Sequence, residues 1–300
     1  MESASFELET SDEFYPRQLQ DYEEAPELLF GRGDPACLLP GVALIGARNA
    51  TPYGISAATA IATWACELGL TVYSGCARGC DQAAHRAALA AEGRTVAVLG
   101  CGADVVYPAR AAGLLDRIAA QGCVLSTYDW GTPPAAYRFR ERNWLIAALS
   151  QFVVVVEARI PSGTFSTVEH ALSLGIGIAA VPGSIFCPGS QAPNRFISEG
   201  AVPLTSREDL CAAVERFLPQ VTVDLVMRPT DTATEQGCTD ELLRALVAQP
   251  STPEELSAAL GLSAREVALR CSRAEIEGSV ERYPDGSYGL SQSELLLRAR

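Results

Sequence analysis

The sequence predicts an α/β protein in which a doubly wound parallel sheet is followed by a small winged-helix domain. Short apolar runs alternate with helical stretches through most of the chain, and a glycine-containing turn follows most of these runs. Alternation of this kind is typical of βαβ units, which build a parallel sheet covered by helices. Near the end of the chain the pattern changes to three helices and a hairpin, which predicts the winged helix.

Composition divides the 300 residues into four segments. Residues 1–13 are polar and acidic, which predicts a disordered leader. Residues 14–218 hold the predicted sheet domain, and residues 238–300 hold the predicted winged helix. Residues 219–237, which are rich in Pro, Thr and Gln, have the composition of a linker.

Most of the net charge of −13 lies at the two ends of the chain. Residues 1–30 contain nine acids and one arginine, and residues 238–300 contain ten acids and seven arginines. The middle is therefore nearly neutral and has room for a locally basic crevice. Because the chain contains no lysine, arginine is the only strong side-chain contact for phosphate.

Ten cysteines are scattered without a C-x-x-C pair, so reduced core thiols are expected rather than a metal or redox site. No metal or cofactor is expected. The chain has no run of about 18 apolar residues and no signal peptide, which predicts a cytoplasmic protein that does not contact membranes.

The first strand–turn–helix unit begins with a buried strand at residues 42–45. Upstream of it, residues 14–33 are expected to form a short helical segment and an edge strand or cover piece. Arg48 follows the strand end, and a helix is expected over residues 55–68, with Gly69 as its C-terminal stop.

The second unit carries the most informative turn, Ser74 to Gly79, between an apolar run and an alanine-rich helix. Gly75 and Gly79 let the backbone fold closely and bring N–H groups toward a ligand. Asp81 is expected to cap the helix, and Arg78 lies at the mouth of the turn. Such a turn suits a phosphate, although glycines needed only for packing would give the same pattern.

Arg48 and Arg78 each follow a strand of the predicted parallel sheet, so both are expected to face one crevice at its carboxyl edge. Further buried strands are expected at residues 95–100, 123–126, 152–157 and 178–181, with helices near residues 111–121 and 166–174.

Residues 137–146 alternate arginines with aromatic side chains, a composition that suits base stacking and phosphate neutralisation. The pattern alone favours another interpretation, a solvated charged turn that enters a helix and buries Trp144, Leu145 and Ile146.

The predicted winged helix has helices at residues 240–248, from 251 onward and at 264–277, then a hairpin at 280–290. Its third helix balances Arg265, Arg270 and Arg273 with three glutamates, whereas a helix that recognises duplex DNA should be basic. A protein-docking or vestigial role fits this helix better.

From about Tyr15 to its end, the chain resembles the DNA-processing protein A (DprA/Smf) family. Six ordered blocks carry the resemblance: Gly46-Ala47-Arg48 with Tyr53-Gly54, Ser74 to Leu89, Gly93 to Tyr107-Pro108, Phe139 to Asn143, Glu157-Ala158 with Ser162-Gly163-Thr164, and Val181-Pro182-Gly183 with Asn194 to Ala201.

The resemblance implies a non-enzymatic protein of natural transformation with an extended Rossmann-like domain. Such proteins dimerise through that domain, bind incoming single-stranded DNA and load the RecA recombinase onto it. The family's dimer and RecA surfaces correspond to a region near residues 204–218. The DNA-binding positions that the resemblance implies are Arg48, Ser74, Gly75, Arg78, Gly79, Phe139, Arg142, Asn143, Gly163 and Thr164.

The chain departs from the family pattern at several of these blocks. Trp144 replaces the second arginine of the family's Arg-Asn-Arg run, which removes one cation. Thr127 replaces a glutamate, Arg140 a proline and Cys80 an isoleucine.

Two other functions stay open. A nucleotide-processing enzyme of the lysine-decarboxylase-like superfamily would share the sheet, but its acidic motif position is Thr167 here. Glu169 lies two residues further, about 200° round the helix. No catalytic constellation is evident, and His85 is expected to pack or cap within its helix. A protein scaffold with a vestigial pocket is the third interpretation.

Overall fold

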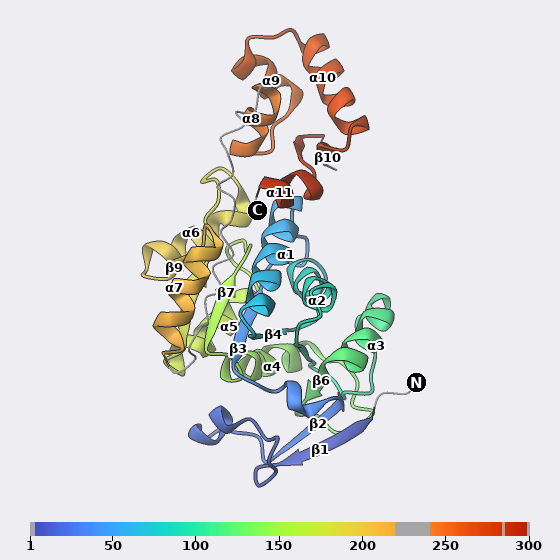
Figure 1. The fold of residues 1–300 in the computed structure, drawn as a ribbon, viewed down its shortest axis with the longest axis vertical. Helices are drawn as coiled ribbons and strands as arrows, with labels where there is room; N and C mark the ends of the chain where they lie inside the picture. Colours follow the sequence, from blue (N-terminus) through green and yellow to red (C-terminus); the bar gives the residue numbers. More distant parts are fainter. Residues whose placement is uncertain (1–3, 220–240, 284–285, 299–300) are drawn as a thin grey trace. The chain divides into compact units, whose positions relative to one another are not determined.

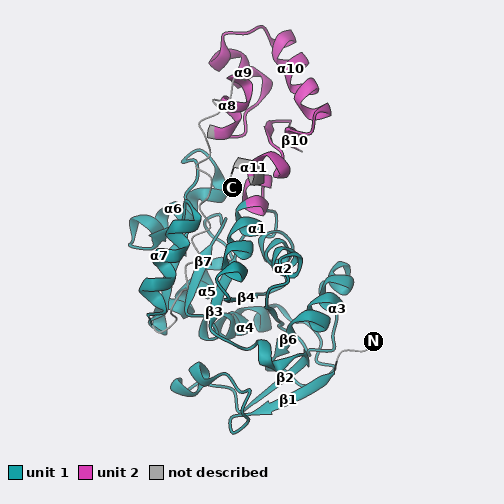
Figure 2. Ribbon diagram, viewed as in Figure 1, with its two compact units in different colours: residues 1–50, 57–224 teal, residues 51–56, 225–300 magenta. Residues whose placement is uncertain are grey.

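The computed structural model describes residues 4–219, 241–283 and 286–298 (Figure 1). The chain divides into two compact units, residues 1–50 with 57–224 and residues 51–56 with 225–300 (Figure 2). Residues 220–237 of the predicted linker lie outside the described residues.

A nine-stranded sheet organises the first unit, with the strand order β1-β2-β6-β5-β4-β3-β7-β8-β9. All neighbouring strands from β6 to β9 are parallel, whereas β1 and β2 are antiparallel additions at one edge. The strands are β1 (Ser5–Glu9), β2 (Leu28–Gly33), β3 (Gly41–Ile45), β4 (Thr71–Ser74), β5 (Thr95–Val98), β6 (Cys123–Ser126), β7 (Phe152–Val155), β8 (Gly177–Ala180) and β9 (Val202–Pro203).

Helices cover both faces of this sheet because side chains alternate along each strand. Along β5 and the residue after it, Val96 and Val98 pack with residues of α4 and α5, while Ala97 and Leu99 pack with residues of α2 and α3. The helices are α1 (Pro52–Glu67), α2 (Cys80–Ala90), α3 (Ala112–Gln121), α4 (Ala136–Ala148), α5 (Thr164–Ser173), α6 (Gln191–Ser198) and α7 (Arg207–Phe217). The predicted α/β class with a mostly parallel sheet is confirmed.

The strand order reverses at β3. From β3 the chain adds β4, β5 and β6 on one side, and it then returns to add β7, β8 and β9 on the other side. The parallel strands β3 to β9 end at one edge, called the carboxyl edge below. In open α/β sheets, ligands bind at this edge near such a reversal.

The disorder expected for residues 1–13 is wrong for residues 5–9, which form β1 and pair with β2. Phe6 is the reason, because its ring lies over Gly31 of β2, where any Cβ would collide with it. An aromatic side chain that covers a glycine of the neighbouring strand fixes the register of both. Since β1 is the outer strand, β2 is not the edge strand that the sequence suggested.

The second unit is the predicted winged helix. Its elements are α8 (Glu241–Ala248), α9 (Pro253–Leu260), α10 (Ala264–Ile276), β10 (Val280–Arg282), β11 (Tyr288–Leu290) and α11 (Gln292–Arg298). Capping boxes at Thr252 and Ser263 start α9 and α10, and Gly261 ends α9 in the left-handed conformation. The sequence pattern after the hairpin did not predict α11.

No helix in the described part of the chain is both long and apolar enough to cross a membrane.

Candidate nucleic-acid interface

A cleft of about 220 Å³ lies at the carboxyl edge, where β3, β4 and β5 end beside α4. Its lining combines cationic, aromatic and glycine residues from four separate chain segments. The lining residues are Arg48, Gly75, Ala77, Arg78, Leu99, Gly100, Cys101, Tyr107, Pro108, Phe139 and Arg142.

Arg48 and Arg78 are exposed at this cleft, and neither forms an ion pair with any described residue. The turns that carry them pack directly on each other. Gly79 adopts a φ of 81°, and a Cβ at this position would collide with the Ala47 carbonyl. The Cys80 N–H donates to that same carbonyl at 3.3 Å. Both conformation and space therefore require glycine at position 79, and this packing places the two guanidinium groups at one cleft.

Arg142 has a different environment from the other two arginines. Its side chain is only 7% exposed, and its Nη1 donates to the carbonyls of Gly75 (3.1 Å) and Val98. Burial lowers the pKa of Arg142, while the charge of Asp81 opposes that shift. Arg142 therefore ties the ends of β4 and β5 together and places a positive charge at the floor of the cleft.

Asp81 holds the turn after β4 in shape rather than capping α2. Its Oδ2 accepts from the N–H groups of Gly75 (3.2 Å) and Ala77 (3.3 Å). A Cβ on Gly75 would lie 2.7 Å from Arg142 Nη2 and 2.9 Å from Asp81 Oδ2, so glycine is required between the two charged groups. The Gly75 N–H, which was expected to face a phosphate, is thus already hydrogen-bonded to Asp81.

Two aromatic rings form one wall of the cleft. The Phe139 and Tyr107 rings are 5.1 Å apart and inclined by 33°, and the Arg142 guanidinium carbon lies 5.8 Å from the centre of the Phe139 ring. Gly100 allows this packing, because a Cβ there would lie 2.8 Å from Phe139 Cδ1. Tyr107, which is 40% exposed, was not among the predicted site residues, although its Tyr-Pro block was recognised in the sequence.

Five predicted site residues do not line the cleft, and one of them is Gly79, whose packing against Ala47 is described above. The Ser74 hydroxyl is buried and donates to the Leu44 carbonyl at 2.6 Å, which joins β4 to β3. Asn143 Nδ2 donates to Ser166 Oγ at 2.7 Å and joins α4 to α5. Thr164 is buried at the start of α5, and Gly163 before it is exposed with open space around its Cα.

Among the described residues that line the cleft there is no acid–base pair. His85 is fully buried, its Nδ1 is hydrogen-bonded to Thr95 Oγ1 at 2.8 Å, and burial lowers its pKa to about 3. On α5, Thr167 is buried and Glu169 is exposed outside the cleft lining. Within the described ranges, no group of three or more His, Cys, Asp and Glu side chains could hold a metal ion.

The fold and the cleft define a class of protein: a parallel α/β protein whose strand ends present free arginines and stacked aromatic rings, the combination that suits a flexible polyanion. Comparison of sequences gives the family. The profile of DNA recombination-mediator protein A matches residues 7–215, and that of the DprA winged helix domain matches residues 227–286. The chain belongs to the DNA recombination-mediator protein A family, as the resemblance predicted.

Relatives from several bacteria agree with this family. DNA processing protein DprA of Streptococcus pneumoniae is 39% identical over 205 residues, which are 68% of this chain and 72% of that protein. Protein Smf of Escherichia coli is 37% identical over 205 residues, 68% of this chain and 55% of that protein.

Solved structures agree as well. The X-ray structure of DprA from Streptococcus pneumoniae has a TM-score of 0.65 at 38% identity and covers 70% of this chain and 74% of that one. A structure of DNA processing protein A from Helicobacter pylori, which concerns its single-stranded DNA binding mode, has a TM-score of 0.64 at 26% identity. It covers 72% of this chain and 99% of that one.

Proposed function

We propose that this chain is a non-enzymatic recombination mediator that binds single-stranded DNA in the cleft at the carboxyl edge. The observation that carries the proposal is the pair of free guanidinium groups, Arg48 and Arg78, beside the Phe139–Tyr107 ring pair. The single-stranded DNA binding mode of the Helicobacter pylori relative supports it.

The chemistry follows from the lining. Arg48 and Arg78 hold phosphates, Arg142 adds charge from the floor, and a base stacks against Phe139 or Tyr107. Stacking contributes about 1–3 kcal/mol per base and accepts any sequence, because every base has a π-face. The cleft therefore binds single strands with little sequence preference, and its affinity falls as salt rises.

The test compares the double variant Arg48→Ala/Arg78→Ala with a control, Arg17→Ala/Arg117→Ala, which removes two exposed arginines outside the cleft. Fluorescence anisotropy with labelled oligothymidylate is measured across a salt series. We expect the cleft variant to lose at least tenfold in affinity and about 1.4 in the slope of log K against log salt, about 0.7 per phosphate contact. Equal binding by the cleft and control variants would refute the assigned cleft.

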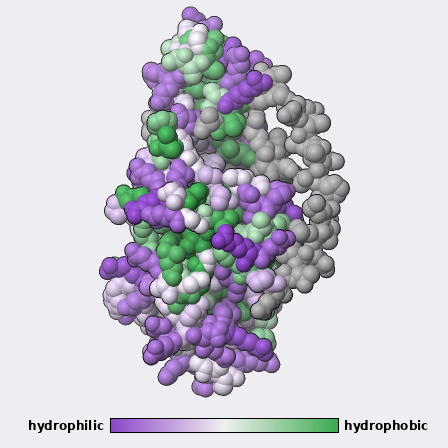
Figure 3. Space-filling view, turned by 90° about the vertical axis from the view of Figure 1, so that its left-hand side faces the viewer, coloured by the Kyte–Doolittle hydropathy of each residue, from purple (hydrophilic) through white to green (hydrophobic). Residues whose placement is uncertain are grey.

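We further propose that the protein acts as a homodimer in natural transformation and loads the RecA recombinase onto bound DNA. The side of the sheet unit that carries α6, β9 and α7 supports the dimer, because hydrophobic residues gather there (Figure 3). Sedimentation of the free protein tests the dimer. Loading is tested by following RecA filament growth on single strands already covered by a single-strand-binding protein, with and without this protein.

The enzyme interpretation has a direct test of its own. The protein is incubated with nucleoside monophosphates and the solution is assayed for released base. The absence of an acid–base pair at the cleft predicts no turnover, and sustained release of base would replace the proposed function with hydrolysis.

A further inference from the structure

A second exposed apolar site lies on the carboxyl edge, outside the cleft. Ile185 and Phe186 follow β8 in the loop of residues 181–190, and they are 80% and 79% exposed. An aromatic side chain with four-fifths of its surface in water has a hydration cost that is removed only when something covers it.

Hydrogen bonds hold this loop against its neighbours. The Asn194 side chain accepts from the Gly183 N–H at 3.1 Å and donates to the Gly183 carbonyl at 2.8 Å. The Phe186 N–H donates to Ser184 Oγ at 3.3 Å, and the Ala158 N–H donates to the Gly189 carbonyl at 2.8 Å. The loop is thus tied both to α6 and to the turn after β7, and it holds its two apolar side chains outward at little further entropic cost.

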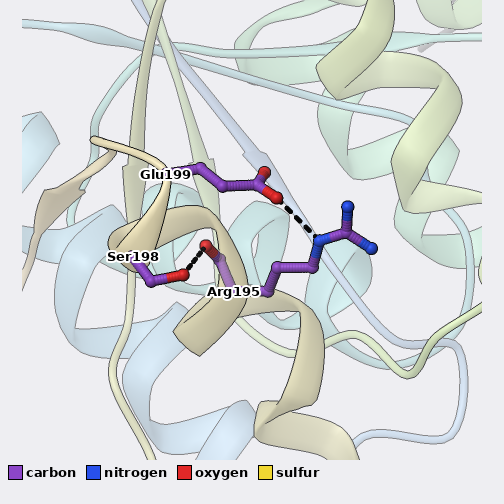
Figure 4. Close-up of polar contacts among 3 residues, drawn as sticks. All are labelled: Arg195, Ser198 and Glu199. Carbon is purple, nitrogen blue, oxygen red and sulfur yellow. Dashed lines mark hydrogen bonds and ion pairs between the residues drawn. The ribbon is translucent and has the colours of Figure 1, made fainter.

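The charges of the neighbouring loops at the carboxyl edge indicate which kind of ligand covers Ile185 and Phe186. The loops after β3, β4, β7 and β8 contain Arg48, Arg78 and Arg159, and their one acid, Glu157, is buried. Arg159 is exposed between the cleft and the β8 loop and forms no ion pair with a described residue, whereas Arg195 on α6 is paired with Glu199 at 2.8 Å (Figure 4). On a chain of net charge −13, this part of the edge, whose four loops carry free cations and no exposed acid, favours a polyanion.

The other side of the cleft, toward β5 and β6, is less suitable for a polyanion. After β5 and β6 the exposed acids Asp104, Asp129 and Glu141 follow the cleft, and Arg138 there lies against the Tyr128 and Tyr137 rings. A polyanion that leaves the cleft on that side would meet carboxylates, whereas toward β8 it meets Arg159.

We infer that single-stranded DNA leaves the cleft toward β8 and stacks a base on Phe186, with Arg159 holding a phosphate between the two sites. This inference rests on the proposed function. From β5 to β8 there are four strand spacings of about 4.8 Å, or roughly 19 Å. That distance corresponds to about six nucleotides at a stacked rise of about 3.4 Å, and to fewer in an extended strand. The Phe186 site therefore sets the length of strand that one subunit binds.

The dependence of affinity on oligonucleotide length distinguishes binding at the cleft from binding at Phe186. The parent, Phe186→Ala, Phe186→Trp and a control, Leu172→Ala, are titrated with oligothymidylates of four, eight, twelve and twenty nucleotides. Leu172 is a matched control because it is 63% exposed near the C-terminal end of α5, which runs away from the carboxyl edge. Arg159→Ala is titrated with the same oligomers across a salt series.

We expect Phe186→Ala to weaken binding of the twelve- and twenty-nucleotide oligomers by about tenfold, as for one lost stacking contact, and binding of the four-nucleotide oligomer by less than about twofold. Phe186→Trp and Leu172→Ala should bind like the parent. Arg159→Ala should lower the salt slope by about 0.7 for the long oligomers alone.

Three results would overturn the inference: unchanged binding of every oligomer by Phe186→Ala, an equal loss for short and long oligomers, or a change in sedimentation of the DNA-free Phe186→Ala protein. The last would show that a second copy covers this loop. A parent that binds no oligomer would overturn the proposed function as well, whereas normal parent binding with an inert Phe186 overturns this inference alone.

Discussion

The three arginines at the cleft have different roles, and their surroundings explain why. Arg48 and Arg78 are exposed and unpaired among the described residues, so replacing them removes charge without leaving a buried group unsatisfied. Arg142 donates to carbonyls at the ends of two strands, so its loss leaves buried acceptors without partners, at about 1–3 kcal/mol. A combined Arg48 and Arg142 variant would therefore confuse lost binding with lost stability.

Gly75 gives the first residue-scale prediction. Because a Cβ would lie under 3 Å from both Arg142 and Asp81, Gly75→Ala should push these groups apart and cost about 1–3 kcal/mol of stability. The measurement is urea unfolding. Gly163→Ala is the control, because its added methyl group meets open space. Equal stability of the two variants would show that the packing at Gly75 does not constrain the turn.

Two buried titratable groups give opposite pH dependences. Burial raises the pKa of Asp81 to about 6, above its ordinary value near 4, so its contribution to stability is present below about pH 4 and is lost as pH rises through 6. Burial lowers the pKa of His85 to about 3, so its contribution is present above about pH 6.5 and is lost as pH falls. Between pH 4 and 6 the two slopes partly cancel.

Asp81→Asn should separate these slopes. Asn keeps an oxygen that can accept from the Gly75 and Ala77 N–H groups but does not titrate. Relative to the parent, the variant should gain stability as pH rises from 4 to 6, by about 2 kcal/mol for a shift of about two pKa units. Chemical denaturation at pH 4, 5, 6 and 7 checks this, and a variant-minus-parent difference that stays flat with pH would contradict it.

At the scale of elements, α4 shows what a sequence pattern can and cannot decide. The alternation of arginines and aromatics allowed either a nucleic-acid-binding segment or a charged entry to a helix. The structure has both features in one helix: Phe139 and Arg142 line the cleft, and Leu145 and Ile146 are buried in the core. The residue types indicated both DNA binding and core packing. Only the packing of α4 beside the ends of β4 and β5 shows which face of the helix lines the cleft and which face enters the core.

Trp144 shows why a family departure at α4 need not weaken the cleft. At 100° per residue, Trp144 lies about 200° from Arg142 round the helix. Its ring packs edge-on against Tyr22 at 6.0 Å and contacts the main core, and it is not part of the cleft lining. The cation that Trp144 replaces therefore does not belong to the cleft of this chain.

Restoring arginine at this position is consequently expected to cost stability without improving binding. Trp144→Arg should lower the free energy of unfolding by about 1–3 kcal/mol through lost aromatic packing. Its affinity for oligothymidylate should stay within about twofold of the parent. Thermal unfolding and anisotropy are measured together, and a large gain in affinity would mean that position 144 reaches the DNA.

For the whole molecule, the parallel strands of the sheet could be predicted from the sequence, whereas the added strand β1 and the residues that neighbouring loops bring together could not. Continuous β-branched runs and glycine turns fix the parallel strands, because both faces of such strands must be apolar. The strand β1 was not predicted because three of its five residues are polar or charged, so the segment resembles an acidic tail. The surface on which Phe6 packs is provided by Gly31, which lies in another strand. Tyr107 and Arg159 escaped for a related reason: strand order, which sequence does not state, decides which loops meet.

The distribution of charge over the chain gives the last prediction. A protein of net charge −13 repels a polyanion at long range even though its cleft attracts one. This repulsion is screened when the Debye length shrinks from about 30 Å at 0.01 M salt to about 8 Å at 0.15 M. Added salt should therefore speed association while it weakens the arginine–phosphate contacts and speeds dissociation.

A variant with less acid in residues 1–30 isolates the long-range effect. Glu13, Glu23, Glu24 and Glu27 are exposed and make no ion pair with a described residue, so the fourfold change to Gln should leave the fold intact. Stopped-flow measurements should show faster association for this variant than for the parent at low salt, equal association at high salt, and equal dissociation at both. A change in dissociation instead would place these glutamates in contact with the DNA, because a charge that acts only at a distance alters the encounter and not the bound complex.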